Sequence, residues 1–303
     1  MSSDDRYAQH LGIAITSILA NRQPGRKIIF HILDGGMSEI NKEKINSLVY
    51  DGIEIKFIQV NQSIFDQFPE MRHLKKATYY RLVAPSIINA PKLLYLDCDL
   101  IVCADIQPLY DLPLKGMVVG AAREISEKYV RQYFFRPIDS YFNAGVMLID
   151  TEKWRRQKVW KRALDFLNEP MSDRKIKYAD QDILNHLLEH NWLDIGRKYN
   201  FQLDRFQKMS AETDYAIIHF VGSLKPWHYM YDNAFGPYYQ QYLGKSPWKE
   251  NIFPDKKIWS PAIRYVRRLV HQVRLAIQKL LPPKIVSALK RVKLALNNRR
   301  DSR

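Results

Sequence analysis

The sequence predicts an α/β protein in which helices cover both faces of a largely parallel sheet. Two observations carry this prediction. Along the first 250 residues, short apolar runs of strand length alternate with segments whose apolar residues recur three and four positions apart, the helical spacing. Such a βαβ order is typical of a parallel sheet with both faces buried. The chain has 303 residues, 46% hydrophobic and 26% charged, which is ordinary for a globular protein and excludes a disordered one.

The expected elements follow in order along residues 1–250, which we take as one domain. Predicted helices cover 7–22, 38–49 and 78–88, with Ser38 as the N-cap of the second and Pro85 inside the third. Predicted strands cover 28–33, 53–60, 93–96, 117–121 and 146–149. Ligands in such folds bind at the carboxyl ends of strands, where Asp34, Asp97 and Asp99 stand.

Residues 251–303 form a second, basic segment. From residue 256 onward there are 14 Lys and Arg and one acid, so most of the net charge of +15 lies here and the body is nearly neutral. Apolar residues recur every three or four positions between arginines, in two runs separated by Pro282 and Pro283. A basic face opposite an apolar stripe is typical of a helix at a membrane surface. We expect this tail to bind anionic membranes; packing on the body or a partner is the alternative, and RNA binding is less favoured, so no nucleic-acid partner is expected.

Three further features favour the cytoplasm. No apolar run reaches the roughly 18 residues needed to span a bilayer. The polar start lacks the layout of a secretory signal. The two cysteines, Cys98 and Cys103, are too few for a disulfide framework and wrongly spaced for a zinc site. Together with the basic tail, these features predict a cytoplasmic protein bound peripherally to the inner face of the cytoplasmic membrane.

The stretch LLYLDCDLIV puts two like charges, Asp97 and Asp99, at the end of an apolar strand. Residues i and i+2 of a strand point the same way, so both carboxylates can reach one cation. Oxygen ligands suit Mg²⁺ or Mn²⁺, and such an ion could hold a diphosphate on its open side. A solvated turn is the alternative. A second Asp-x-Asp, Asp180 to Asp182, precedes a helical run, where an N-cap is the simpler interpretation.

Six blocks of the body together carry a family resemblance. In order they are SSDDRY (2–7), TYYRL (78–82), LYLDCDLIV (94–102), YFNAGVMLID (141–150), YADQDILN (178–185) and HFVGSLKPWH (219–228). The body resembles glycosyltransferase family 8, most closely the bacterial lipopolysaccharide and lipooligosaccharide galactosyl- and glucosyltransferases. The resemblance implies a GT-A-type, Rossmann-like mixed sheet flanked by helices, UDP-sugar donors, Mn²⁺, and retention of the anomeric configuration.

The resemblance also implies a metal site. Asp97 and Asp99 look like the metal-binding pair, and His219 resembles the family's third protein ligand. A neutral imidazole suits Mn²⁺ better than Mg²⁺, although Mg²⁺ is possible. Taken alone, a histidine at a strand end would more often be structural.

The donor-binding residues come from the same resemblance. Asp4 matches the acid that reads the uracil, Ser2 would offer backbone groups, and Arg6 stands where many members carry Asn. Arg81 and Lys225 would face the donor sugar and diphosphate, while Gly222 would let backbone N–H groups approach phosphate oxygens. Further candidates around donor or acceptor are Thr78, His73, Glu124 (which replaces a common Asp), Asp97 itself and Cys98, whose side chain we expect to pack on the opposite face.

Asn143, Asp180 and Gln181 look like the group that contacts the sugar near the reacting carbon. Retention in hydrolases normally uses a carboxylate nucleophile, but the matched position here is Gln181, an amide. We therefore favour a front-face mechanism, in which the acceptor attacks on the side that UDP leaves and Gln181 stabilises an oxocarbenium ion. Asp180 as a nucleophile is the competing hypothesis, and a turn role is the alternative for Asn143.

The start of the chain departs from the family. A hydrophobic strand normally precedes the block matching SSDDRY, but here only Met1 precedes it. We therefore expect the first strand to be missing and folding or UDP binding to be weakened. The predicted function is Mn²⁺-dependent, retaining transfer of galactose or glucose from a UDP-sugar to a lipid-linked, lipopolysaccharide-type oligosaccharide. The alternative is a non-catalytic or impaired sugar-nucleotide-binding protein.

Overall fold

The structure, a computed structural model, describes residues 1–65, 76–127, 130–131, 134–168, 176, 178–203, 214–229, 231, 233–251 and 269. The chain divides into one unit of Met1–Trp227 with Tyr231–Ile252 and a second of His228–Met230 with Phe253–Arg303. The elements and the site described below belong to the first unit.

An N-terminal sheet has the parallel βαβ arrangement that the sequence predicted. Its strands, in spatial order, are β1 (Ser2–Ser3), β2 (Ile28–Asp34) and β3 (Ile53–Gln59), and all neighbours are parallel. Parallel neighbours need a crossover, which is supplied here by α1 (Ala8–Asn21) and α2 (Glu39–Asn46). Ser38 is the N-cap residue of α2, as predicted, and its N–H and hydroxyl both donate to Asp5 Oδ1 at 2.7 Å.

The central sheet is mixed, which corrects the expectation of a largely parallel sheet. Its spatial order is β4 (Lys92–Leu96), β7 (Phe142–Asp150), β6 (Val119–Arg123) and β8 (Trp192–Asp194). β7 runs antiparallel to both β4 and β6, whereas β6 and β8 are parallel. An apolar run looks the same whichever way its strand points, so the order of elements could not reveal this reversal. The mixed sheet that the family resemblance implied is confirmed.

A third, small sheet brings the end of the body next to the middle of the chain. It contains β5 (Leu100–Val102), β10 (Ile217–His219) and β9 (Phe201–Gln202), with β10 in the centre. β10 is antiparallel to β5 and parallel to β9. The register places His219 opposite Leu100, so the histidine stands beside the residue that follows Asp99.

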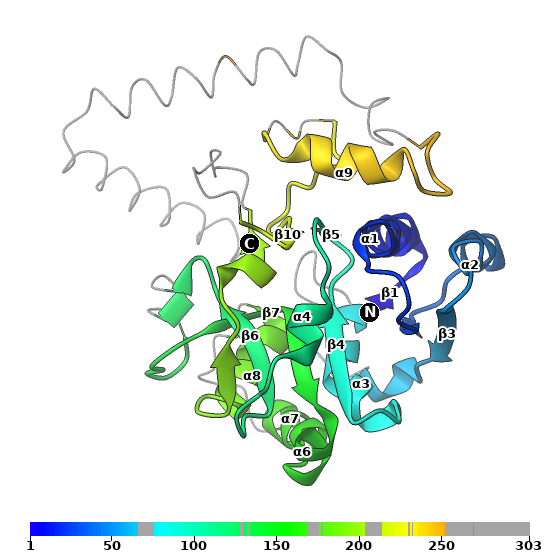
Figure 1. Ribbon diagram of the computed structural model, residues 1–303. Coiled ribbons are helices and arrows are strands. Elements are labelled where there is room, and N and C mark those ends of the chain that lie inside the picture. The colour runs from blue at the N-terminus through cyan, green and yellow to red at the C-terminus, as the bar shows by residue number, and fades with distance from the viewer. Residues whose placement is uncertain are drawn as a thin grey trace, which may run out of the picture. The chain divides into compact units, whose positions relative to one another are not determined.

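The remaining helices complete the layers (Figure 1). α3, α6 and α7 contact one another, and α8 contacts α7 and β7. The helix expected over 78–88 begins as a 3₁₀ turn before α3, with Pro85 inside α3 as predicted. The bounds are α3 Tyr80–Ile87, α4 Gln107–Asp111, α6 Thr151–Arg156, α7 Val159–Asn168, α8 Ala179–Leu187 and α9 Gly236–Leu243, with 3₁₀ turns η1 Asp5–Tyr7, η2 Gln62–Phe65, η3 Lys76–Tyr79 and η4 Arg197–Tyr199.

Helix α1 lies at the centre of one of the two large cores. Its residues from Ala8 to Ile18 are all buried. Gly12 allows the ring of Trp248 to pack so closely that a Cβ on this glycine would stand 2.1 Å from Trp248 Cζ3. The His10 ring stacks on Trp227, with 3.5 Å between centroids. These contacts tie the N-terminal helix to the end of the body.

The first strand, which was expected from the sequence to be missing, is present as the two-residue β1 paired with β2. Met1 continues its ladder on β2, because the N-terminal amine donates to His31 O at 3.0 Å and Met1 O accepts from Leu33 N at 2.9 Å. Burial lowers the pKa of this amine to about 6. A cavity of about 320 Å³ lies beside it, lined largely by apolar residues of β2 and β4 that include Phe30 and Leu94.

The basic tail predicted for residues 251–303 lies outside the described residues, apart from Asn251 and the helical Leu269. Within the described part of the chain, every helix is too short or too polar to cross a bilayer.

Candidate active site

The loop between β4 and β5 holds Asp97 and Asp99, and backbone hydrogen bonds fix it on both sides. Asp97 N donates to Gly145 O of β7 at 2.8 Å. Phe220 N, which follows β10, donates to Asp99 O at 2.9 Å. Both carboxylates therefore sit where the central sheet meets the small sheet, at the end of an apolar strand as predicted.

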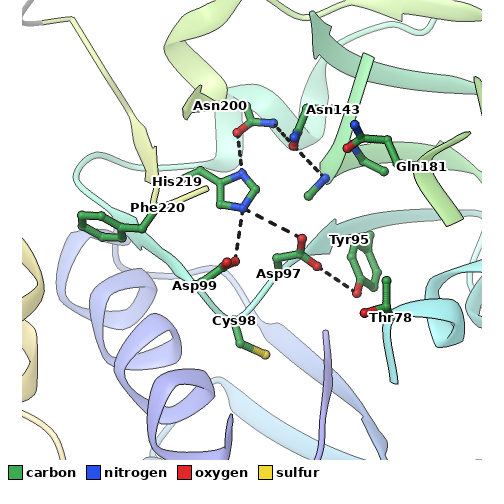
Figure 2. A network of polar contacts seen from close by, with 12 residues as sticks. Thr78, Tyr95, Asp97, Cys98, Asp99, Asn143, Gln181, Asn200, His219 and Phe220 are labelled. Atoms are coloured by element: carbon green, nitrogen blue, oxygen red, sulfur yellow. Dashed lines mark hydrogen bonds and ion pairs between the residues drawn. The ribbon is translucent and has the colours of Figure 1, made fainter. Parts of the chain in front are cut away.

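His219 closes a three-residue cluster with these aspartates. Its Nε2 lies 3.1 Å from Asp99 Oδ1 and 3.9 Å from Asp97 Oδ2. One ligand atom from each residue lies within 4.8 Å of the other two, and His219 is buried. Figure 2 shows the imidazole edge facing both carboxylates. Two carboxylates and one imidazole nitrogen form a donor set that fits a divalent cation such as Mn²⁺.

Gly145 makes room for this cluster, and sequence reasoning did not single it out. A Cβ on this glycine would stand 2.2 Å from His219 Cε1 and 2.8 Å from Asp97 Oδ2. Neither group can retreat without leaving the cluster, so the position requires glycine. The signal in the sequence was a glycine inside a strand pattern, which marks a close approach.

Arg81 joins the first aspartate to the predicted catalytic group. Its Nη1 donates to Ala144 O at 2.6 Å and its Nη2 to Asp97 Oδ1 at 2.9 Å. Its Nε lies 2.8 Å from Asp180 Oδ2. Burial disfavours the charged guanidinium, but the carboxylates of Asp180 and Asp97 outweigh that effect and raise the pKa of Arg81.

Lys225 neutralises the second aspartate. Its Nζ donates to Asp99 Oδ2 and, at 2.6 Å, to Phe220 O. Burial acts to raise the pKa of Asp99, but Lys225 and His219 outweigh it and hold this pKa well below its usual range. Burial also raises the pKa of Asp97, and the nearby Arg81 offsets this only in part. The two aspartates therefore differ, and Asp99 is the firmly ionised one.

The predicted sugar-contacting residues meet at Glu124. Asn143 Nδ2 donates to Glu124 Oε2 at 2.9 Å, and Gln181 Nε2 donates to the same oxygen at 3.3 Å. Gln181 Oε1 accepts from Ala144 N at 3.0 Å. Glu124, which the resemblance offered only as a residue near donor or acceptor, thus orients both amides.

Asp180 is not the N-cap that the alternative interpretation proposed. α8 begins at Ala179 with Tyr178 as its N-cap residue, and it is Asp182 that accepts from Tyr178 N, at 2.8 Å. Asp180 points toward Arg81 instead, although the Arg81 Nε–H is directed at Thr78 O. Burial raises the pKa of Asp180 to about 7.

The residues expected to bind the nucleotide lie around β1. Asp4 accepts from Tyr7 N at 3.1 Å and pairs with Arg6 at 2.7 Å, so the departure at Arg6 changes the surroundings of the predicted uracil-reading acid. Ser2 Oγ lies 2.8 Å from Tyr95 Oη, and that hydroxyl donates to Asp97 Oδ1 at 3.2 Å. Ser2 of β1 is therefore linked to Asp97 by hydrogen bonds through the Tyr95 hydroxyl.

The structure places the other predicted residues as follows. Cys98 is buried, as expected for a packing residue, with its Sγ donating to Ser2 O at 2.9 Å. Thr78 contributes its carbonyl oxygen to Arg81. Gly222 adopts a φ of +85°, a conformation that favours glycine, in the loop after β10. His73 lies outside the described residues.

Comparison with a protein-family model now adds to this geometry. The model of "Glycosyl transferase family 8" matches residues 1–231. This chain belongs to that family. It is 30% identical over 264 residues to General stress protein A of Bacillus subtilis, covering 81% of this chain and 92% of the relative. It is 32% identical over 263 residues to the lipopolysaccharide glucosyltransferase WaaO of Escherichia coli, covering 82% and 77%.

A solved structure agrees with the family assignment. The galactosyltransferase LgtC in complex with donor and acceptor sugar analogues superposes with a TM-score of 0.70 at 30% identity, over 81% of this chain and 94% of that one. The GT-A-type fold is therefore confirmed, and this family 8 chain is a glycosyltransferase. All six blocks that carried the resemblance lie inside the matched residues 1–231.

Replacing Gly145 with Ala is expected to weaken binding of a divalent cation at least about tenfold, because the added methyl group must displace His219 or Asp97. Titration calorimetry with Mn²⁺ measures the change. Gly236→Ala is the matched control, since its Cβ would meet Tyr231 Cδ1 at an ordinary 3.4 Å. Equal affinities for the wild type and Gly145→Ala would contradict the assignment of this cluster.

Replacing Asp180 with Asn is expected to change how stability depends on pH. A carboxyl whose pKa rises from 3.8 to about 7 on folding binds more protons in the native than in the unfolded state between these values. Stability from this group is therefore highest below about pH 4 and falls as the pH rises to about 7, by roughly 4 kcal/mol at most. The unfolding free energies of the wild type and Asp180→Asn are measured in urea from pH 4 to 8. As the pH rises, the wild type should lose stability relative to the variant, because Asn does not titrate. A constant difference would show that the pKa of Asp180 is near its usual value.

Proposed function

We propose that this glycosyltransferase moves a hexose, galactose or glucose, from a UDP-sugar to a lipopolysaccharide-type oligosaccharide with retention of configuration. The observation that carries the proposal is the cluster of half-buried Asp97 and Asp99 with buried His219, against which two cationic side chains, Arg81 and Lys225, are placed. Half-buried carboxylates so close together require cationic partners. A site that concentrates positive groups around a metal-ligand cluster suits a departing diphosphate.

The metal proposed for this cluster is Mn²⁺. Asp97, Asp99 and His219 would hold it, and the presence of an imidazole nitrogen among the ligands favours Mn²⁺ over Mg²⁺. When bound, the ion supplies positive charge that stabilises the UDP leaving group as the bond to the sugar breaks.

Besides the metal ion, two groups of the protein would bind the diphosphate: the Lys225 ammonium and backbone N–H groups near Gly222. Lys225 is held by Asp99 and by Phe220 O, and both lie next to the cluster. Its ammonium is positioned to pair with a phosphate oxygen without leaving Asp99. The left-handed backbone at Gly222 turns the following loop so that N–H groups can face an anion.

The arrangement of Asp180 and Gln181 supports a front-face mechanism. Asp180 is buried, paired with Arg81, and half protonated near pH 7, so it is poorly suited to attack as a nucleophile. Gln181 is held in place by Glu124 and Ala144 N, and as an amide it is a poor nucleophile. In this proposal the acceptor hydroxyl attacks on the face that UDP leaves, a phosphate oxygen takes its proton, and Gln181 stabilises positive charge on the sugar.

The donor and acceptor classes come from relatives. One relative is named a lipopolysaccharide glucosyltransferase and another, from Salmonella typhimurium and 23% identical, a lipopolysaccharide 1,3-galactosyltransferase. A UDP-hexose donor and an oligosaccharide acceptor carried on lipid follow as the proposed pair. We propose that the protein acts in the cytoplasm, at the inner face of the cytoplasmic membrane, where its basic tail would hold it near that acceptor.

A non-catalytic or impaired sugar-nucleotide-binding protein is the second candidate. The observation that favours it is the ion pair between Arg6 and Asp4, because it engages the acid that would otherwise read the uracil. Turnover separates the two candidates.

The wild-type protein is expected to release UDP from UDP-galactose or UDP-glucose in the presence of Mn²⁺, and to lose this activity in a chelator. Asp99→Asn should reduce turnover by at least about a hundredfold, because it removes a ligand charge and the carboxylate that pairs with Lys225. A coupled UDP-release assay with a panel of donors reads out both results.

Binding of UDP without turnover of any donor would favour the second candidate. A peptide glycosylated on Asp180, trapped with a slow donor, would replace the front-face mechanism with a double displacement.

Deleting residues 256–303 is expected to leave turnover with soluble acceptors unchanged and to release the protein from anionic vesicles, since the deleted segment carries 14 Lys and Arg. Vesicle sedimentation with and without phosphatidylserine measures binding. Neutral vesicles are the control. Unchanged sedimentation of the truncated protein would contradict the role of the tail.

A further inference from the structure

Asn200 is a buried polar residue that touches the metal-ligand cluster and that the sequence did not point to. It stands between η4 and β9 and is fully buried, with 0% of its surface exposed. Its side chain makes two hydrogen bonds, one to His219 and one to Asn143 (Figure 2). A buried amide that joins two functional side chains can decide the orientation of both.

The direction of each hydrogen bond follows from one fixed donor. Gly145 N–H is a backbone group and can only donate, and it reaches Asn143 Oδ1 at 3.0 Å. The atom of Asn200 that lies 2.9 Å from the same oxygen must therefore be the nitrogen, Nδ2. The opposite end of the Asn143 amide is then its nitrogen, which agrees with its contact to the Glu124 carboxylate at 2.9 Å. No freedom to flip either amide is left.

The same logic fixes the tautomer of His219. With Nδ2 turned to Asn143, the atom of Asn200 that faces His219 Nδ1 at 2.9 Å is the carbonyl oxygen Oδ1. A carbonyl oxygen accepts, so Nδ1 carries the proton and donates. The other ring nitrogen, Nε2, is then the one that faces Asp99 and Asp97 and that would serve as the ligand atom for a metal. That is the ring orientation a metal ligand needs.

The hydrogen bonds continue beyond Asn143 to the predicted catalytic amide. Asn143 and Gln181 share Glu124 Oε2 as acceptor. A single polar chain thus runs from His219 through Asn200, Asn143 and Glu124 to Gln181. Each link has one possible direction, so a change at Asn200 affects both ends.

We propose that Asn200 is a positioning residue: its carbonyl oxygen holds His219 in the Nδ1–H tautomer for metal binding, and its amide nitrogen holds Asn143 for the sugar. This inference rests on the proposed role of Asp97, Asp99 and His219 as metal ligands. It assigns two separable functions to the two ends of one side chain. A residue that only filled the core would show no such separation.

Two substitutions separate these functions. Asn200→Leu keeps a similar volume and removes both hydrogen bonds. Asn200→Asp keeps an oxygen that accepts from His219 Nδ1 but puts a second acceptor opposite Asn143 Oδ1. Asn185→Leu is the matched control, because Asn185 is also buried and hydrogen-bonded, to Phe142 and Gln181 backbone groups, but does not contact His219.

Two readouts are taken on the full-length protein. Long-range ¹H–¹⁵N spectra of the metal-free protein report whether Nδ1 of His219 carries a proton, and the signal is assigned by its loss in His219→Gln. Titration calorimetry reports the dissociation constant for Mn²⁺. We expect the Nδ1–H signal to be absent in Asn200→Leu. We also expect the affinity of this variant for Mn²⁺ to fall about 10- to 100-fold, the usual effect of removing a residue that orients a ligand. Asn200→Asp should keep the signature and stay within about threefold of the wild-type affinity while its sugar-transfer rate falls.

Asn200→Asp by itself tests the proposed role of Asn200 if Asn200→Leu does not fold. Loss of the Nδ1–H signature in Asn200→Asp, or its retention in a folded Asn200→Leu, would overturn the proposal. The same holds if Asn185→Leu alters the tautomer as much as Asn200→Leu. Should the wild type fail to bind Mn²⁺, the metal assignment of the proposed function fails, while the tautomer comparison still tests the role of Asn200.

Discussion

The repulsion between Asp97 and Asp99 is the constraint on which the rest of this site depends. Two half-buried carboxylates this close cannot both stay ionised without cationic partners. The chain supplies these partners from well-separated positions, with Arg81 on α3 against Asp97 and with Lys225 after β10 against Asp99. The fold must therefore bring the N-terminal half and the end of the body together before either aspartate is neutralised.

Strand β7 is the element that makes this assembly possible. Over three consecutive residues it provides an amide that binds Asn200 and Glu124, a carbonyl that accepts from Arg81, and a glycine that admits the His219 ring. Because β7 is antiparallel to β4, its Gly145 lies opposite the point where β4 ends and Asp97 begins. The reversal of this strand, which departs from a simple parallel sheet, is thus what places the candidate metal-ligand cluster beside the residues proposed to contact the sugar.

The polar groups of the site form two branches that meet at β7. One branch is charged and runs from Asp180 through Arg81 to Asp97. The other is built mainly of amides and runs from Gln181 through Glu124, Asn143 and Asn200 to His219. Asp180 and Gln181 are neighbours on α8, so one helix begins both branches, and a shift of α8 would be transmitted to Asp97 and His219. The high pKa of Asp180 reflects burial in this arrangement rather than a lack of charged neighbours.

The sequence by itself determined the elements and the residue types of the chemistry. Apolar periodicity located α1, β2, α2 and β3 to within a few residues. Asp97, Asp99 and His219 were named because they lie in short sequence motifs that can be recognised without a structure. The sequence could not give the direction of β7, the requirement for glycine at 145, or the roles of Asn200 and Glu124. Each of these is a contact between segments distant in sequence, and nothing in the local pattern of a buried asparagine or a strand glycine says what will approach it. Only the tertiary structure decided them, because hydrogen-bond direction and close packing are properties of pairs of residues and not of single positions.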